Sequence, residues 1–307
     1  MNKQKIVPIL FLIIIAGAII LSIKDKIGTT SNTQNDTRLQ VTTSFYPLYF
    51  FASQIGGDKA NVINITPAGN EPHDYEPSPQ DIKAIVNSKL LVLNGGSLET
   101  WGDKIKEVVN PSHTLIVVAG QDIINQTLAE GGNTVVDPHV WLSPPLAEQM
   151  VDKIKAGFEA VDPANTAYYE AQAQALKLKL SDLDAQYQKG LSSCTKRDFV
   201  TSHAAFGYLA TAYHLNQIPI AGLSPDSEPS PRQLSDIIQL AKKDNIKYIF
   251  FESLASPKLS ETIAREVGAQ TLVLNPIEGL TPDDIAHGQD YFTEMQSNLI
   301  NLEIACK

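Results

Sequence analysis

The stretch from residue 162 to residue 189, DPANTAYYEAQAQALKLKLSDLDAQYQK, decides how the rest of the chain is divided. Asp162 and Pro163 are typical of a helix start, as the N-cap and the first-turn proline. Apolar residues then recur at steps of three and four, at Tyr169, Ala173, Leu176, Leu180, Leu183 and Tyr187. This spacing predicts one helix that buries a single stripe along its length. At a rise of about 1.5 Å per residue the helix would be roughly 40 Å long, enough to span two lobes.

Short runs rich in β-branched and other apolar residues alternate with helical patterns on both sides of this segment. They lie at 62–65, 90–93 and 115–118 before it, and at 199–201, 248–251 and 271–274 after it. Such alternation predicts parallel sheets covered by helices on both faces. We therefore expect an α/β protein of two lobes, each a parallel-type sheet flanked by helices, joined by one long rigid helix. A single domain that contains a long helix is the alternative.

A repeated pentapeptide supports the division into lobes. The residues EPSPQ at 76–80 recur as EPSPR at 228–232, each time before an amphipathic pattern. Both serines suit a helix N-cap, and both following prolines suit the first helical turn. Convergent helix-start chemistry would also explain the match. We expect an N-terminal lobe at 38–161, a linking helix at 162–189 and a C-terminal lobe at 190–307.

The first 26 residues indicate a membrane segment. Lys3 and Lys5 precede an apolar run from residue 6 to residue 23, which Lys24, Asp25 and Lys26 close. A helix of that length reaches roughly 27 Å, close to the hydrocarbon thickness of a bilayer. We expect an uncleaved anchor at 1–26, with a removed signal peptide as the alternative. The polar residues 27–37 are typical of a flexible linker.

Composition narrows the class of partner. The formal net charge of −10 disfavours nucleic acid, because binding phosphates requires a basic face. The two cysteines, Cys194 and Cys306, lack the spacing of a structural zinc site. Outside the cytoplasm we expect them to form a disulfide that holds the chain's end to the start of the C-terminal lobe; two free thiols are the alternative.

Common enzyme motifs are missing from the sequence. It contains no phosphate-binding Gly-x-x-x-x-Gly-Lys, no Gly-x-Gly-x-x-Gly after a strand, no Gly-x-Ser-x-Gly and no His-Glu-x-x-His. This disfavours an enzyme, and we expect a binding protein.

Four metal-binding side chains lie in loops that come mostly after predicted strands: His73, His139, His203 and Glu278. Ligands of open α/β sheets bind beyond the carboxyl ends of strands. Because two of the four come from each predicted lobe, a cleft between the lobes would bring them together. Three imidazoles and one carboxylate suit a zinc ion in tetrahedral coordination.

The remaining polar residues near these loops have weaker cases. We assign His113 to a strand start and His214 and His287 to helices, and expect none of them at the site. Asp74 and Asp137 are candidate acceptors that would orient an imidazole, or else loop residues that contact only water.

Four motifs, in this order, carry a resemblance to a known family. They are GNEPHDYEPSP at 69–79, DPHVWL at 137–142, TSHAAFGY at 201–208 and LNPIEGL at 274–280. With them, nearly everything from residue 40 onward resembles the zinc and manganese solute-binding proteins of ABC transporters. The resemblance implies two α/β lobes joined by a long helix, with metal held at the lobe interface by residues that match His73, His139, His203 and Glu278.

The resemblance also implies a function. We expect an extracytoplasmic protein, periplasmic or on the cell surface, that takes up zinc as a monomer and delivers it to an ABC transporter permease. Relatives that prefer manganese tend to place a carboxylate at the position of His203, so nitrogen here favours zinc. The chain departs from many zinc-binding relatives in having no histidine at 120–136 and no lipid-bearing cysteine after its apolar run.

Three alternatives stay open at this point. The first is the same fold with manganese or iron as cargo. The second is a zinc hydrolase, which needs an open coordination position for water and a general base such as Glu71 or Glu76. The third is an adhesive surface protein, for which the anchor is the only supporting feature.

Overall fold

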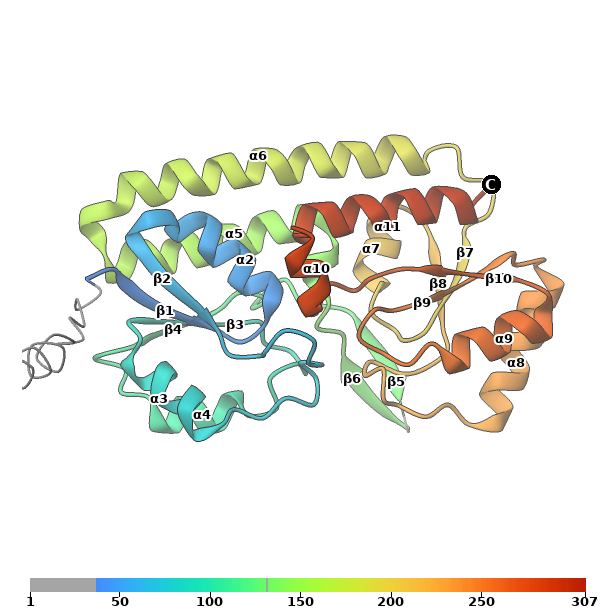
Figure 1. Ribbon diagram of the computed structural model, residues 1–307, viewed down its shortest axis with the longest axis horizontal. Coiled ribbons are helices and arrows are strands. Elements are labelled where there is room, and N and C mark those ends of the chain that lie inside the picture. Colours follow the sequence, from blue (N-terminus) through green and yellow to red (C-terminus); the bar gives the residue numbers. More distant parts are fainter. Residues whose placement is uncertain (1–36, 131) are drawn as a thin grey trace, which may run out of the picture. The chain divides into compact units, whose positions relative to one another are not determined.

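The computed structural model describes residues 37–130 and 132–307, and residues 38–307 form one compact unit (Figure 1). Most of the predicted anchor and linker, residues 1–36, lies outside the described residues. Among the residues that are described, no helix is long and apolar enough to cross a membrane. The predicted bounds of the two lobes stay a prediction; below, the N-terminal and C-terminal lobes are the two sheets with the helices packed on them.

The N-terminal sheet has the order β2-β1-β3-β4, and all its pairs are parallel. Its strands are β1 (Leu39–Thr43), β2 (Ala60–Asn64), β3 (Leu90–Leu93) and β4 (Leu115–Val118). Leu90 and Val92 belong to the core formed with α2 (Tyr46–Gly56) and α5 (Pro144–Val161). Leu91 and Leu93 belong to a second core, formed with α3 (Pro79–Asn87) and α4 (Gly102–Val108). The run LLVL is apolar throughout because both faces of the strand are covered.

The C-terminal sheet has the order β10-β9-β7-β8, also parallel. Its strands are β7 (Asp198–Thr201), β8 (Asn216–Pro219), β9 (Tyr248–Phe251) and β10 (Gln270–Val273). Val200 and Ile249 pack with α8 (Pro231–Lys243) and α9 (Lys258–Val267). Phe199 and Phe250 belong to the large core that also includes α11 (Tyr291–Ala305). The other helices of this lobe are α7 (Gly207–Ala212) and α10 (Pro282–Ala286).

One long helix, α6 (Thr166–Leu191), runs past both sheets, as Figure 1 shows. All six residues of its predicted stripe are buried, in a core that contains residues of both lobes. Asp162 and Pro163 are the N-cap and first residue of a 3-10 turn, η3 (Pro163–Asn165), which leads directly into α6 at Thr166. The Asp162 carboxylate caps no helix N–H; it accepts hydrogen bonds from Asn165 Nδ2 (2.7 Å) and Tyr169 Oη (2.6 Å).

The repeated pentapeptides have the predicted role. Ser78 and Ser230 are the N-caps of α3 and α8, each completes a capping box, and each is followed by the expected proline. The two helices occupy the same place in the two lobes, between the second and third strands. The repeat therefore marks one supersecondary unit that the chain uses twice.

Several elements were not predicted. They are β1, β8, the antiparallel hairpin of β5 (Thr127–Glu130) and β6 (Asn133–Val136), and the 3-10 turns η1 (Gly57–Lys59) and η2 (Val140–Leu142). β8 is an edge strand that ends at Pro219, and proline is tolerated at sheet edges although it weakens a strand pattern. The hairpin lies between β4 and the loop that carries His139, so it is an insertion into the repeated unit.

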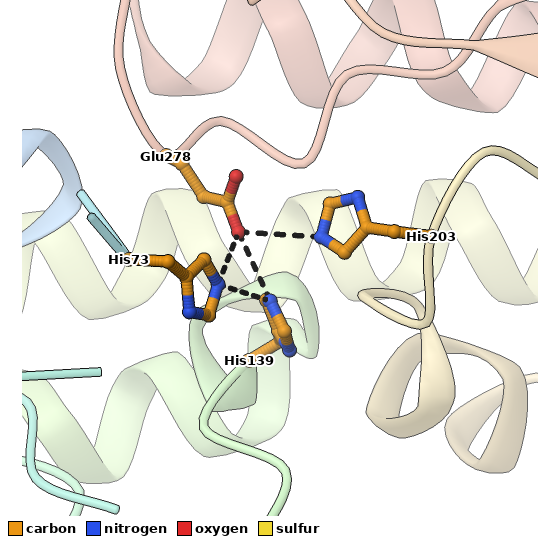
Figure 2. A group of neighbouring side chains, drawn as sticks. All are labelled: His73, His139, His203 and Glu278. Atoms are coloured by element: carbon orange, nitrogen blue, oxygen red, sulfur yellow. Dashed lines mark hydrogen bonds and ion pairs between the residues drawn. The ribbon is translucent and has the colours of Figure 1, made fainter. Parts of the chain in front are cut away.

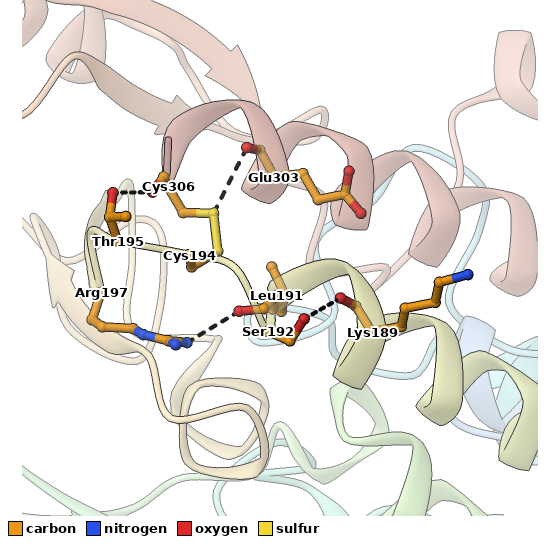
Figure 3. The surroundings of a disulfide bond; sticks show 8 residues. All are labelled: Lys189, Leu191, Ser192, Cys194, Thr195, Arg197, Glu303 and Cys306. Atoms are coloured by element: carbon orange, nitrogen blue, oxygen red, sulfur yellow. Dashed lines mark hydrogen bonds between the residues drawn. A yellow bond between two sulfur atoms is a disulfide. The ribbon is translucent and has the colours of Figure 1, made fainter.

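Cys194 and Cys306 form the predicted disulfide (Figure 3). It joins the segment after α6 to the residue that ends α11. The backbone N–H groups of Thr195 and Lys196 also donate to the Cys306 carbonyl, at 3.1 and 3.0 Å. The end of the chain is thereby held against the start of the C-terminal lobe.

Candidate metal centre

The four candidate ligands meet between the two sheets (Figure 2). His73 lies in the loop between β2 and α3, and His139 is the residue before η2. His203 follows β7, and Glu278 follows β10. Their candidate ligand atoms all lie within 4.8 Å of one another. The fold thus brings together all four residues, two from each lobe.

The distances between the ligand atoms fit an ion in tetrahedral coordination. Glu278 Oε1 lies 3.1 Å from His73 Nε2, 3.0 Å from His139 Nε2 and 3.5 Å from His203 Nε2. The Nε2 atoms of His73 and His139 are 3.2 Å apart. A tetrahedral zinc ion about 2.0–2.1 Å from each ligand requires ligand atoms roughly 3.3 Å from one another. These four separations are close to that value, and the two between His203 and the other imidazoles are within 4.8 Å.

Burial also points to a metal. His139 and His203 are 0% exposed and Glu278 is 1% exposed. Among the described residues, His203 Nε2 and Glu278 Oε2 have no hydrogen-bond partner although both atoms are buried. A buried polar atom without a partner is costly, and a bound ion would remove that cost.

Two of the imidazoles are hydrogen-bonded through Nδ1 to carboxylates. His139 Nδ1 lies 2.7 Å from Asp137 Oδ1, which also accepts the His139 backbone N–H. His203 Nδ1 lies 2.7 Å from Glu252 Oε1. A proton on Nδ1 that is donated to a carboxylate leaves the Nε2 lone pair free to bind a metal. Asp137 therefore has the orienting position that the sequence suggested.

Asp74, the other candidate acceptor, lies elsewhere. Its carboxyl group lies against that of Asp226 of the C-terminal lobe, and this neighbour raises the pKa of Asp74. Glu252 was missed entirely. It directly follows the predicted strand 248–251, and this place at the carboxyl end of a strand was the one signal that could have identified it.

The histidines and carboxylates of the centre shift one another's pKa values. Burial alone would lower the pKa of His139 and His203, but the carboxylates beside them raise both, that of His203 to well above its usual range. Burial alone would raise the pKa of Glu278, yet His203 and the other histidines hold it well below its usual range. Without a metal, the centre therefore holds protons on imidazoles next to an ionised carboxylate.

Glu71 does not have the properties of a general base. Burial and the nearby Glu278 charge raise the pKa of its carboxyl group to about 9. At neutral pH it already carries its proton, so it cannot accept another from a water molecule. Glu76 is exposed on the loop that leads into α3.

Further hydrogen bonds tie the two lobes together around the centre. Trp141 Nε1 donates to the Pro276 carbonyl (2.8 Å), close to Glu278, and Tyr291 Oη donates to the Trp141 carbonyl (2.5 Å). Tyr208 Oη, on α7, accepts the backbone N–H groups of Asn125 (2.8 Å) and Gln126 (2.9 Å). It also lies 3.2 Å from the Asp137 carbonyl.

The other histidines lie away from the centre. His113 lies in a turn shortly before β4 and is exposed. The predicted helical positions of His214 and His287 were wrong, because both lie in turns just after a helix. His214 has a φ of 57°, a left-handed conformation that ends α7, and His287 is the C-cap of α10.

Comparison with known proteins gives consistent results. Residues 41–305 match the ZnuA family model, described as zinc-uptake complex component A, periplasmic. The high-affinity zinc uptake system protein ZnuA of Bacillus subtilis is 41% identical over 276 residues, which cover 85% of this chain and 86% of that protein.

Solved structures give the same picture. The Zn(II)-bound ZnuA-like domain of Streptococcus pneumoniae AdcA is 40% identical, with a TM-score of 0.77 over 88% of this chain and 99% of that domain. The chain spans 57% of the length of full AdcA. A laminin-binding protein of Streptococcus agalactiae, described as having adhesin and metal transporting activity, is 32% identical with a TM-score of 0.78, over 88% of this chain and all of that one.

The family match covers nearly the whole compact unit from residue 38 onward, including all four candidate ligands. The chain therefore belongs to the ZnuA family, the periplasmic A components of zinc-uptake complexes.

Proposed function

We propose that this chain captures a zinc ion between its two lobes, through His73, His139, His203 and Glu278, and delivers it to the permease of an ABC importer. One observation carries the proposal: four ligand atoms from both lobes, three of them on buried residues, lie within 4.8 Å of one another, and four of their separations, 3.0–3.5 Å, are close to those of a tetrahedral site. The names of the relatives, a zinc uptake protein and a zinc-bound domain, support zinc as the cargo.

The donor set favours zinc over manganese. Three imidazole nitrogens and one carboxylate oxygen form a borderline-soft, compact set, whereas manganese prefers oxygen donors. His203 is the residue on which this preference depends most, because a carboxylate in its place would make the set two nitrogens and two oxygens. Manganese or iron remains the alternative cargo.

Capture without catalysis fits the centre better than hydrolysis. Four protein ligands complete a tetrahedron, so no position is left for a reactive water molecule. Glu71, the half-buried residue beside the ligands that the sequence offers as a base, has the pKa of its carboxyl group raised to about 9. We therefore assign the chain no enzymatic activity.

The location follows from the family. Its description as periplasmic supports a place outside the cytoplasm. We further propose that residues 1–26 hold the chain to the membrane as an uncleaved helix, on the evidence of the apolar run from residue 6 to residue 23 alone. We expect the binding unit to be a monomer. Adhesion lies outside the proposal.

Elemental analysis and competitive zinc titration of residues 38–307 test the proposal. We expect one zinc per chain, held more tightly than manganese. His203→Ala and Glu278→Ala should each weaken zinc binding by more than about 100-fold, beyond the effect typical of residues that only orient a ligand. His287→Ala is the matched control, because this exposed histidine lies on the same lobe away from the centre. Preference for manganese, or zinc binding unchanged in His203→Ala, would overturn the proposal.

A further inference from the structure

We infer that Glu252 is a positioning residue for the zinc centre: its carboxylate holds the His203 ring so that Nε2 faces the ion, and this contact contributes to zinc affinity. The inference rests on the proposed function, since it concerns how one of the proposed ligands is held. Glu252 lies in none of the four motifs that carry the family resemblance.

The contacts of Glu252 are concentrated on one ligand. Its Oε1 atom lies 2.7 Å from His203 Nδ1 and 3.2 Å from the His203 backbone nitrogen, and it accepts a hydrogen bond from Ser202 Oγ. Glu252 is 4% exposed, so water does not compete strongly for this carboxylate. Glu252 directly follows β9, and Ser202 and His203 are the two residues after β7; the two strands are neighbours that pair through Val200 and Ile249. Regular strands therefore define the position of this contact.

His203 depends on this contact more than His139 depends on Asp137. His139 Nε2 has a second contact, 3.0 Å from Glu278 Oε1, which helps to orient the ring. His203 Nε2 is 3.5 Å from the same oxygen and has no hydrogen-bond partner among the described residues. The ring is thus held at its Nδ1 side. A carboxylate that accepts the Nδ1 proton also makes Nε2 a stronger donor to a metal.

The N-terminal lobe contains a natural control for this arrangement. Its sheet has the same strand order, and Ser44 follows β1 as Ser202 follows β7. Ser44 Oγ donates to Glu99 Oε1 at 2.5 Å, and the backbone N–H groups of Asn94 and Gly95 donate to the same carboxylate at 2.7 and 2.8 Å.

The loops after β1 and β7 differ in the residue that follows the serine. Phe45 occupies that position in the N-terminal lobe, where its ring packs against Trp141. His203 occupies it in the C-terminal lobe. Glu99 therefore accepts hydrogen bonds from residues that follow strands of its sheet and contacts no candidate ligand. Glu252 also accepts such hydrogen bonds, and in addition it contacts the candidate ligand His203. The same substitutions at Glu99 and Glu252 therefore distinguish a carboxylate that only stabilises the fold from one that also positions a metal ligand.

The first experiment compares Glu252→Ala and Glu252→Gln with Glu99→Ala and Glu99→Gln in the whole 38–307 unit. Competitive titration with a chromophoric chelator measures zinc affinity, and thermal unfolding without metal measures stability. We expect Glu252→Ala to weaken zinc binding by about 10–100-fold, the range typical of carboxylates that support a metal-bound histidine. Glu252→Gln should have a smaller effect, because its amide oxygen still accepts the Nδ1 proton. The Glu99 variants should lose stability and keep their zinc affinity.

A second measurement does not respond to a general loss of stability. In the zinc-loaded protein, the His203 Nδ1 proton should give a downfield ring N–H signal that exchanges slowly with water. The signal should disappear in Glu252→Ala, shift in Glu252→Gln and stay in both Glu99 variants. An unchanged signal in Glu252→Ala, or equal loss of zinc affinity in the Glu252 and Glu99 variants, would overturn the inference.

His203→Ala, measured in parallel, distinguishes the two levels of the argument. If His203→Ala keeps full zinc affinity, the proposed centre itself is wrong. If His203→Ala weakens binding but Glu252→Ala and Glu252→Gln do not, only the role of Glu252 is wrong. Glu252→Gln keeps the size of the side chain, so the comparison stands even if Glu252→Ala fails to fold.

Discussion

The N-terminal sheet, β2-β1-β3-β4, and the C-terminal sheet, β8-β7-β9-β10 when taken in the same direction, share one strand order but present different residues at equivalent loops. The loop before the first pentapeptide carries His73, whereas the loop before the second carries Pro225 at the same spacing. After the first strand of each sheet the roles reverse, with Phe45 in one lobe and His203 in the other.

This difference shows how a repeated fold makes an asymmetric site. The N-terminal lobe provides two imidazoles, and the C-terminal lobe provides one imidazole and the only carboxylate ligand of the four. Neither lobe holds enough ligands for a closed tetrahedral site. Tight binding therefore requires both lobes at once, and interlobe contacts become part of the binding equilibrium.

The largest expected effect is that of pH on zinc binding. The pKa values of His139 and His203 are raised in the metal-free centre, so both rings hold protons below those values. Zinc must displace these protons, and affinity therefore falls as pH falls, starting above the ordinary histidine pKa of about 6.5. We expect about tenfold loss per pH unit for each proton displaced, measured by competitive titration between pH 8 and pH 5.5.

Changing one lobe at a time sharpens this result. Asp137→Asn removes a charge that raises the pKa of His139, so zinc binding should start to weaken at a lower pH than in the parent chain. Glu99→Gln, which touches none of the four candidate ligands, should leave the pH curve in place. An affinity that is equal at pH 7.5 and pH 5.5 would contradict the three-histidine centre.

A smaller effect is expected at the contact between the lobes that Tyr208 makes. Tyr208→Phe removes the oxygen that accepts two backbone N–H groups of residues 125 and 126. Leaving such donors without a partner costs about 1–3 kcal/mol each when they are buried, and these are partly buried, so we expect the lower part of that range. Chemical unfolding should show this loss, and zinc should dissociate faster in a stopped-flow chelator assay.

Tyr213→Phe is the control for the Tyr208 change. Tyr213 Oη donates to Asp184 on α6 and lies within the C-terminal lobe and the long helix, away from the residue 125–137 segment. Its loss should lower stability without faster zinc release. Equal zinc release rates in the two variants would show that Tyr208 does not hold the lobes around the ion.

The smallest expected effect tests whether the repeated pentapeptides are equivalent. Ser78→Ala and Ser230→Ala each remove an N-cap that completes a capping box. Each should lower the free energy of unfolding by about 1 kcal/mol, and the two losses should be similar. Thermal or chemical unfolding measures both. A loss confined to one serine would show that the two helices contribute differently despite their common sequence.

Much of the fold was predictable from local patterns. The strand run 90–93 and the stripe on α6 were found because both faces of β3, and one face of α6, are buried along their whole lengths. β8, with the sequence NQIP, escaped because an edge strand needs little apolar surface and tolerates proline. The first turn of the predicted helix is a 3-10 turn, which the spacing of apolar residues does not reveal.

The four candidate ligands were predictable because each lies in a loop with its own local motif, and the order of the motifs identifies the family. Glu252 was not predictable in this way. Its significance comes from β7 and β9 being neighbours in the sheet, although 50 positions separate Ser202 from Glu252 along the chain. Local sequence patterns carry no information on which strands are neighbours.

The sequence by itself determined the α/β class, the long connecting helix and the four side chains that could bind an ion. Only the tertiary structure decided that these side chains meet at tetrahedral spacing, that Asp137 and Glu252 hold two of the rings, and that Asp74 faces Asp226 instead. The reason is physical: burial periodicity and helix caps act over a few residues, whereas a metal centre depends on sheet order and on how two lobes pack.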